Sequence, residues 1–148
     1  MSAAGGEFPL ILVRNLQRTV AVNTLDLEQF AAKAVRACFQ SKKRRATDLT
    51  KLREVSVLIV SDRRMALLHR RFLNQSGPTD VLTFKHGEIF ISAETARRNA
   101  RAFRNSLAGE LRLYVVHGLL HLHGFDDRTQ VDARAMEARQ RKILGSVK

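Results

Sequence analysis

Two histidines four residues apart, His117 and His121, are the residues of this sequence whose type and spacing best suit metal chemistry. On a helix this separation places both imidazoles on one face, about 40° apart, and zinc sites use the same spacing. The alternative is a buried helix that carries hydrogen-bonded histidines without an ion. Because a third histidine, a glycine and two aspartates follow directly, the segment favours a metal site.

The spacing alone leaves the third ligand open. Gly124 lets the chain reverse after the helix, which can bring Asp126 or Asp127 back over the histidine face. His123 points about 200° away from His121 on a helix, so it joins the same ion only if the helix has already ended. Three protein ligands leave a position for a metal-bound water, which is a nucleophile toward phosphodiesters or amides near neutral pH.

The residue after His117 separates two kinds of metal-dependent hydrolase. Metalloproteases of the H-E-x-x-H type carry their general base, a glutamate, at this position, and here it is Gly118. A metalloprotease therefore lacks its base and is the weakest interpretation of the site.

Two C-terminal helices are expected to position the cluster. Residues 111–122 are apolar apart from one arginine and the two histidines, which indicates a helix buried on most sides that ends at Gly124. A last helix is predicted over about 129–144, with Thr129 and Asp132 as a capping pair.

The rest of the chain alternates apolar runs with helical patterns. Strands are predicted over residues 10–14, 55–60, 80–84 and 88–91, the last two joined around 85–87. A helix over about 25–40 has Thr24 or Asp26 as its N-cap, and a second follows Ser61 or Asp62. The second is expected to have Met65, Leu68 and Phe72 on one side, and a third, from Ser92, to bury Ala93, Ala96, Ala100 and Phe103. The pattern predicts a single α+β domain over 1–148, a small sheet covered by helices, with a flexible tail over 1–8.

Charge and composition point to a partner. The chain has 148 residues, enough for one domain, and its 26 Lys and Arg against 14 Asp and Glu give a net charge of +12. Such a surface suits a polyanion, first nucleic acid and next an anionic membrane. Cys38 lies among apolar residues and is expected to be a buried thiol. With no signal peptide and no apolar run of the ~18 residues that span a bilayer, we expect a cytoplasmic protein without a membrane anchor.

Two groups of basic residues could contact phosphates, or could be ordinary solvated surface. One is the run from Lys42 to Arg45. The other is a set of four arginines on the helix after Ser92: Arg97, Arg98, Arg101 and Arg104.

The cluster H-G-L-L-H-L-H-G-F-D-D at 117–127 resembles the YbeY family of metal-dependent endoribonucleases, whose motif is H-G-x-L-H-L-x-G-[FY]-D-H. Two further segments are similar to family blocks in order and spacing, namely P-T-D-V-L at 78–82 with Phe84, and G-E-I-F-I-S at 87–92. The resemblance covers about residues 8–144.

The resemblance implies a small mixed β-sheet flanked by helices and one zinc-type ion on three ligands. It also implies single-strand-specific RNA cleavage in 3′-end maturation of the 16S ribosomal RNA of the small ribosomal subunit, and in ribosome quality control. His117 and His121 match two ligands, and Asp127 stands where the family has a third histidine. A carboxylate lowers the charge of the metal unit by one, so reduced activity or a shift to higher pH is expected.

A second departure lies at Leu73, where the family carries an arginine thought to act on the scissile phosphate. Arg70 and Arg71 are displaced by about 300° and 200° on a helix, so Arg70 is the candidate substitute. The leading hypothesis is therefore a metal-dependent endoribonuclease that acts on structured or ribosomal RNA, with one zinc ion or another divalent transition metal. The alternative is a ribosome-associated RNA-binding factor whose cleavage is weakened or lost through Leu73 and Asp127.

Overall fold

A small mixed sheet forms the centre of the molecule. The computed structural model describes residues 8–40, 46–73 and 80–148. Its strands are β1 (Leu10–Asn15), β2 (Glu54–Val60), β3 (Val81–Phe84) and β4 (Glu88–Ser92), in the order β1-β2-β4-β3. Strands β1, β2 and β4 run parallel to one another, and β3 pairs antiparallel with β4. The α+β class and the predicted hairpin are confirmed, whereas the run 42–45 and residues 78–79 lie outside the described ranges.

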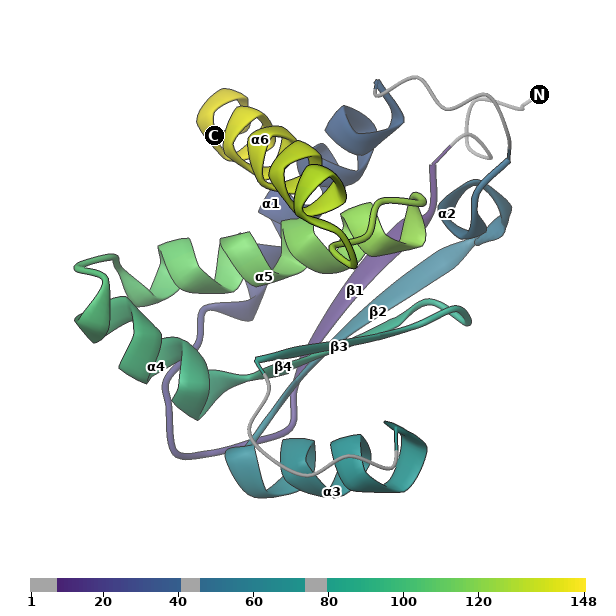
Figure 1. Ribbon diagram of the computed structural model, residues 1–148. Helices are drawn as coiled ribbons and strands as arrows, with labels where there is room; N and C mark the ends of the chain where they lie inside the picture. Colours follow the sequence, from purple (N-terminus) through teal and green to yellow (C-terminus); the bar gives the residue numbers. More distant parts are fainter. Residues whose placement is uncertain (1–7, 41–45, 74–79) are drawn as a thin grey trace.

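Helices cover both faces of this sheet. They are α1 (Thr24–Phe39), α2 (Asp48–Lys51), α3 (Asp62–Leu73), α4 (Ala93–Ala102), α5 (Leu107–Leu122) and α6 (Gln130–Ser146). Helix α5 crosses one face of the sheet and is itself covered by α6, while α3 lies against the opposite face (Figure 1). The predicted histidine helix is thus the central helix of the fold.

The main core lies between the sheet and helices α1 and α5. Alternate residues of β2 and β4, among them Val57, Ile59 and Ile89, point to this face and are fully buried. Gly118 of α5 packs directly on Ile89, where an added Cβ would lie 2.7 Å from a side-chain carbon. Glycine at this position therefore lets the histidine helix approach the sheet closely.

Some of the predicted helix ends are confirmed and others differ in the structure. Thr129 accepts a hydrogen bond from the Asp132 amide and Gly124 is left-handed at φ 90°, as predicted. The predicted N-cap of α1 was wrong. Asn23, rather than Thr24 or Asp26, is the cap, and its side chain accepts a hydrogen bond from the Asp26 amide at 3.0 Å. Helix α5 also begins four residues earlier than expected, because the Ser106 side chain caps it.

Two aromatic residues are more exposed than their patterns suggested. Phe103 was expected in the buried stripe of α4, but the helix ends at Ala102 and the ring is 72% exposed. Phe72 is 56% exposed, although its ring meets Phe84 edge-to-face at 5.5 Å. Cys38 is fully buried as predicted, and burial raises the pKa of its thiol to about 12, so it is no nucleophile. No helix among the described residues is long and apolar enough to cross a membrane.

Asp62, at the start of α3, joins that helix to α4. Its carboxylate accepts hydrogen bonds from the hydroxyls of Ser92 and Thr95 and an ion pair from Arg98 at 2.7 Å. Partial burial alone would raise the pKa of Asp62, but these three donors outweigh it and lower the pKa to about 2. The carboxylate is therefore charged wherever the protein is folded near neutral pH.

We expect Asp62→Asn to lower the free energy of unfolding at pH 7 by about 1 kcal/mol, since the carboxylate is partly exposed and screened. A lowered pKa stabilises the fold above the unfolded value of about 3.9, and this contribution is lost as the pH falls toward 2. Urea unfolding at pH 7 and pH 3 measures both effects. The control is Glu137→Gln, which removes only an exposed pair with Arg141 at 3.9 Å. Equal stabilities of Asp62→Asn and the parent at pH 7 would contradict the expectation.

Candidate metal centre

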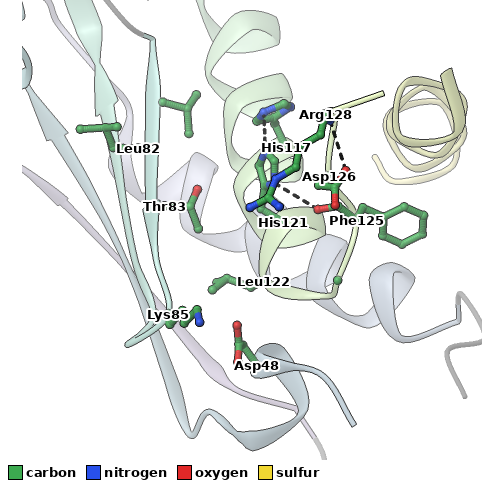
Figure 2. Close-up of a pocket in the computed structure, with 12 residues that line it drawn as sticks. Asp48, Leu82, Thr83, Lys85, His117, His121, Leu122, Phe125, Asp126 and Arg128 are labelled. Atoms are coloured by element: carbon green, nitrogen blue, oxygen red, sulfur yellow. Dashed lines mark hydrogen bonds between the residues drawn. The ribbon is translucent and has the colours of Figure 1, made fainter. Parts of the chain in front are cut away.

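His117 and His121 lie one turn apart on α5, with their rings facing each other. The Nε2 atoms are 3.0 Å apart and the ring centroids 4.5 Å apart. Both side chains are partly buried and border a cleft (Figure 2). The helical spacing of four residues therefore brings the two imidazoles together, as predicted.

Each imidazole is held through its other nitrogen. His121 Nδ1 lies 3.1 Å from the Phe125 carbonyl oxygen, which can only accept, so Nδ1 carries the proton and Nε2 has a free lone pair. His117 Nδ1 lies 2.6 Å from Gln140 Oε1 of α6, which also accepts, so this Nδ1 carries a proton and His117 Nε2 has a free lone pair. The Phe125 carbonyl is in place because the chain turns at Gly124 and the Phe125 amide donates to Leu120.

The donors fit a divalent ion. With both Nδ1 atoms protonated, two Nε2 lone pairs face each other at 3.0 Å, which is unfavourable unless a cation lies between them. Two nitrogens at zinc–nitrogen bond lengths on a tetrahedral ion are about 3.3 Å apart, close to the separation seen. Burial, followed by the neighbouring His117, lowers the pKa of His121, which keeps this donor neutral.

The third donor nearest this pair is Asp127. Among the described residues, His117, His121 and Asp127 form the group that could hold an ion, with their donor atoms all within 4.8 Å of one another. Asp126 borders the cleft too, and its carboxylate accepts a bond from the Arg128 amide at 3.2 Å. Of the three candidates that the sequence left open, the geometry favours Asp127.

His123 has a different environment. It is the C-cap of α5, is 3% exposed, and stacks on the Phe39 ring at 5.5 Å. Its Nδ1 lies 2.9 Å from Thr47 Oγ1, next to α2. The side chain thus fastens α2 to the end of α5 and is not part of the donor group.

The cleft beside the histidines has a volume of about 450 Å³ and is lined by β3, α2, α5 and the loop after α5. Sequence reasoning missed three polar side chains on its walls: Thr83, Lys85 and Arg128. Thr83 and Lys85 belong to the β3 side, whereas Arg128 extends from the loop toward the histidines (Figure 2). Gln140 was missed as well, because no local pattern signals a contact between two helices.

The predicted arginines lie elsewhere. Arg70 is exposed on α3, on the sheet face opposite α5, and no described residue of α3 lines the cleft. Arg98 is paired with Asp62, and Arg104 lies beyond the end of α4 with φ 54°. Arg97 is partly buried and Arg101 is exposed. Arg97, Arg98 and Arg101 thus lie on α4 as expected, whereas Arg104 lies beyond its end, and their contact with RNA stays a prediction.

Gln140→Ala is expected to weaken zinc binding by about 10-fold to 100-fold, because His117 loses the acceptor that orients its ring. Competition with a chelator of known zinc affinity measures the change. Gln140→Glu keeps an acceptor and should retain the affinity, and Gln130→Ala, at an exposed position of the same helix, is the control. Parental affinity in Gln140→Ala would show that the ring needs no partner.

Comparisons with known proteins agree with the arrangement. A family model described as Endoribonuclease YbeY matches residues 12–148. A protein of that name from Gluconobacter oxydans (strain 621H) is 40% identical over 106 residues, 68% of this chain and 63% of its own length. Another from Anaeromyxobacter sp. (strain Fw109-5) is 38% identical over 100 residues, 61% of this chain and 52% of its own. The matched part thus spans between about half and two thirds of these two relatives.

A solved structure shares the fold. The solution structure of TM1509 from Thermotoga maritima superposes with a TM-score of 0.62 at 28% sequence identity. The match covers 90% of this chain and 86% of that one. The sheet and its helices are thus arranged as in a protein studied in solution.

Proposed function

Since the chain belongs to the endoribonuclease YbeY family, as its motifs suggested, we propose that it is a metal-dependent endoribonuclease that cleaves single-stranded RNA. The observation that carries the proposal is the histidine pair, in which both Nδ1 atoms are engaged and both Nε2 atoms point to one place. Such a pair is built to hold a cation, and Asp127 completes a three-donor set.

The residues at the cleft have separate roles in this proposal. His117, His121 and Asp127 would hold one zinc ion, or a similar divalent ion, and leave a side open to the cleft. A bound ion supplies Lewis acidity, which activates water and polarises a phosphate. Gln140 and the Phe125 carbonyl orient the two imidazoles, and Gly118 keeps their helix close to the sheet.

We further propose maturation of the 3′ end of 16S ribosomal RNA, ribosome quality control, and action on the small ribosomal subunit in the cytoplasm. These assignments rest on the family. The net charge of +12 supports them, since it favours association with a polyanion such as ribosomal RNA.

A second candidate function is RNA binding without cleavage. It is favoured by two departures from the family motifs, Leu73 in place of an arginine and Asp127 in place of a histidine. Both substitutions fall on positions that the family uses for catalysis. The basic residues that could bind RNA are still present. A metalloprotease has no support, because Gly118 faces Ile89 in the core and no glutamate follows His117.

The test is cleavage of end-labelled RNA by protein purified without an affinity tag. Its metal content is measured first, and single-stranded and fully duplexed RNA are then compared with zinc, after chelation, and after zinc is added back. Cleavage of the single strand that disappears with chelation and returns with the ion supports the enzyme. Tight binding without cleavage with several divalent metals and across pH would favour the RNA-binding factor.

A further inference from the structure

Arg128 places a free guanidinium beside the candidate metal centre. We propose that Arg128, with the hydroxyl of Thr83, binds the phosphate that is to be cleaved, and so takes the part of the arginine that Leu73 replaces. The inference deepens the proposed function and rests on it. It assigns a phosphate subsite to Thr83, which lies within the segment 78–84, and to Arg128, which directly follows the histidine motif.

The backbone of Arg128 is fixed on both sides. The Arg128 amide donates to the Asp126 carboxylate at 3.2 Å, and the next residue, Thr129, caps α6. The side chain is exposed, lines the cleft, and points toward the histidine pair (Figure 2). It has no ion-pair partner among the described residues, so its donors are available to a ligand. A guanidinium binds phosphate through two parallel N–H donors.

The charges of the cleft make this guanidinium important. Two cations, Lys85 and Arg128, face three carboxylates, those of Asp48, Asp126 and Asp127. With neutral histidines, a divalent ion gives this set a net charge of +1. Without Arg128 the same set is neutral, and its attraction for a phosphodiester anion is largely lost.

Thr83 provides an independent second observation. Its Oγ1 is buried at the cleft wall on β3, and it has no hydrogen-bond partner among the described residues. Buried hydroxyls are nearly always paired, so a lone one at a cleft wall is suited to a ligand oxygen. Figure 2 shows Thr83 across the cleft from Arg128. The two side chains therefore line opposite walls of the space in which we place the phosphate.

The main test is Arg128→Gln in the zinc-loaded protein, with inorganic phosphate as the probe. We expect phosphate to bind at least about 10-fold more weakly and kcat/KM for single-stranded RNA to fall about 100-fold. Zinc affinity should stay level or rise, since a nearby positive charge is removed. The matched control is Arg134→Gln, at an exposed position of α6 outside the cleft, which should change each value less than 2-fold.

Thr83→Val separates a ligand contact from a structural role. Removing a hydroxyl that has no partner should leave thermal stability equal or higher, yet weaken phosphate binding and lower kcat/KM by about 10-fold. If Arg128→Gln binds phosphate as tightly as Arg134→Gln does, the subsite is overturned. If the parent binds phosphate but cleaves no RNA, the nuclease proposal fails while the phosphate titrations still decide the subsite.

Discussion

Replacing His121 with alanine is expected to abolish both zinc binding and RNA cleavage. The imidazole supplies one of three donors, and the bond from its Nδ1 to the Phe125 carbonyl leaves Nε2 facing the ion site. Loss of an orienting partner alone costs 10-fold to 100-fold in affinity, and loss of the donor should exceed about 1000-fold. Metal content, chelator competition and cleavage of single-stranded RNA measure the effect.

His86→Ala is the matched control for this variant. His86 is exposed at the turn between β3 and β4 and belongs to no donor group among the described residues. Circular dichroism and thermal unfolding show whether His121→Ala keeps the fold, which we expect because the side chain lies at the cleft and outside the main core. A folded His121→Ala protein that retains one zinc ion and parental cleavage would place the metal centre elsewhere.

Local sequence rules accounted for the elements that carry the site. Apolar runs rich in β-branched residues predicted the strands, and the apolar segment of α5 with Gly124 predicted the histidine helix and its end. The histidine pair followed from helical geometry alone, because four residues always return a side chain to the same face. These features depend on residues that are close in sequence, so they can be predicted from the sequence alone.

The ends of the helices were predicted less well from the sequence. Phe103 follows the helical period of α4, yet the helix stops one residue before it, so its ring lies in solvent. The four-residue helix α2 is too short to show any period and was missed. It forms because Thr47 and Thr50 cap each other, and His123 then holds it against α5. Competing caps and tertiary contacts decide such details.

The surroundings of the metal centre depend on tertiary structure and were not predictable. Gln140 reaches His117 because α6 folds back over α5, and Thr83 reaches the cleft because β3 lies at the sheet edge next to α5. Arg70 was predicted as the substitute for the missing arginine from its position on the same helix as Leu73. Helix α3 lies on the other face of the sheet, whereas Arg128, which lines the cleft beside the histidines, comes from the loop after α5.

Replacing Asp127 with histidine should increase activity at neutral pH. The carboxylate neutralises one positive charge of the ion, whereas an imidazole neutralises none, so three histidines make the ion a stronger Lewis acid. The acid limb of the pH profile of kcat/KM should then move to lower pH, by up to about one unit, given that zinc ligation shifts the pKa of water between about 9 and 7. Asp127 is exposed next to the histidine pair, so the larger side chain has room.

The pH profile distinguishes this effect from a general gain in RNA affinity. Asp126→His removes the same negative charge from the cleft at a residue outside the donor group, and it should change RNA affinity without moving the acid limb. A parallel shift in both variants would mean that cleft charge, and not ligation by residue 127, controls the profile. An acid limb that moves only in Asp127→His would identify Asp127 as the ligand that holds this chain's activity to higher pH than a three-histidine site.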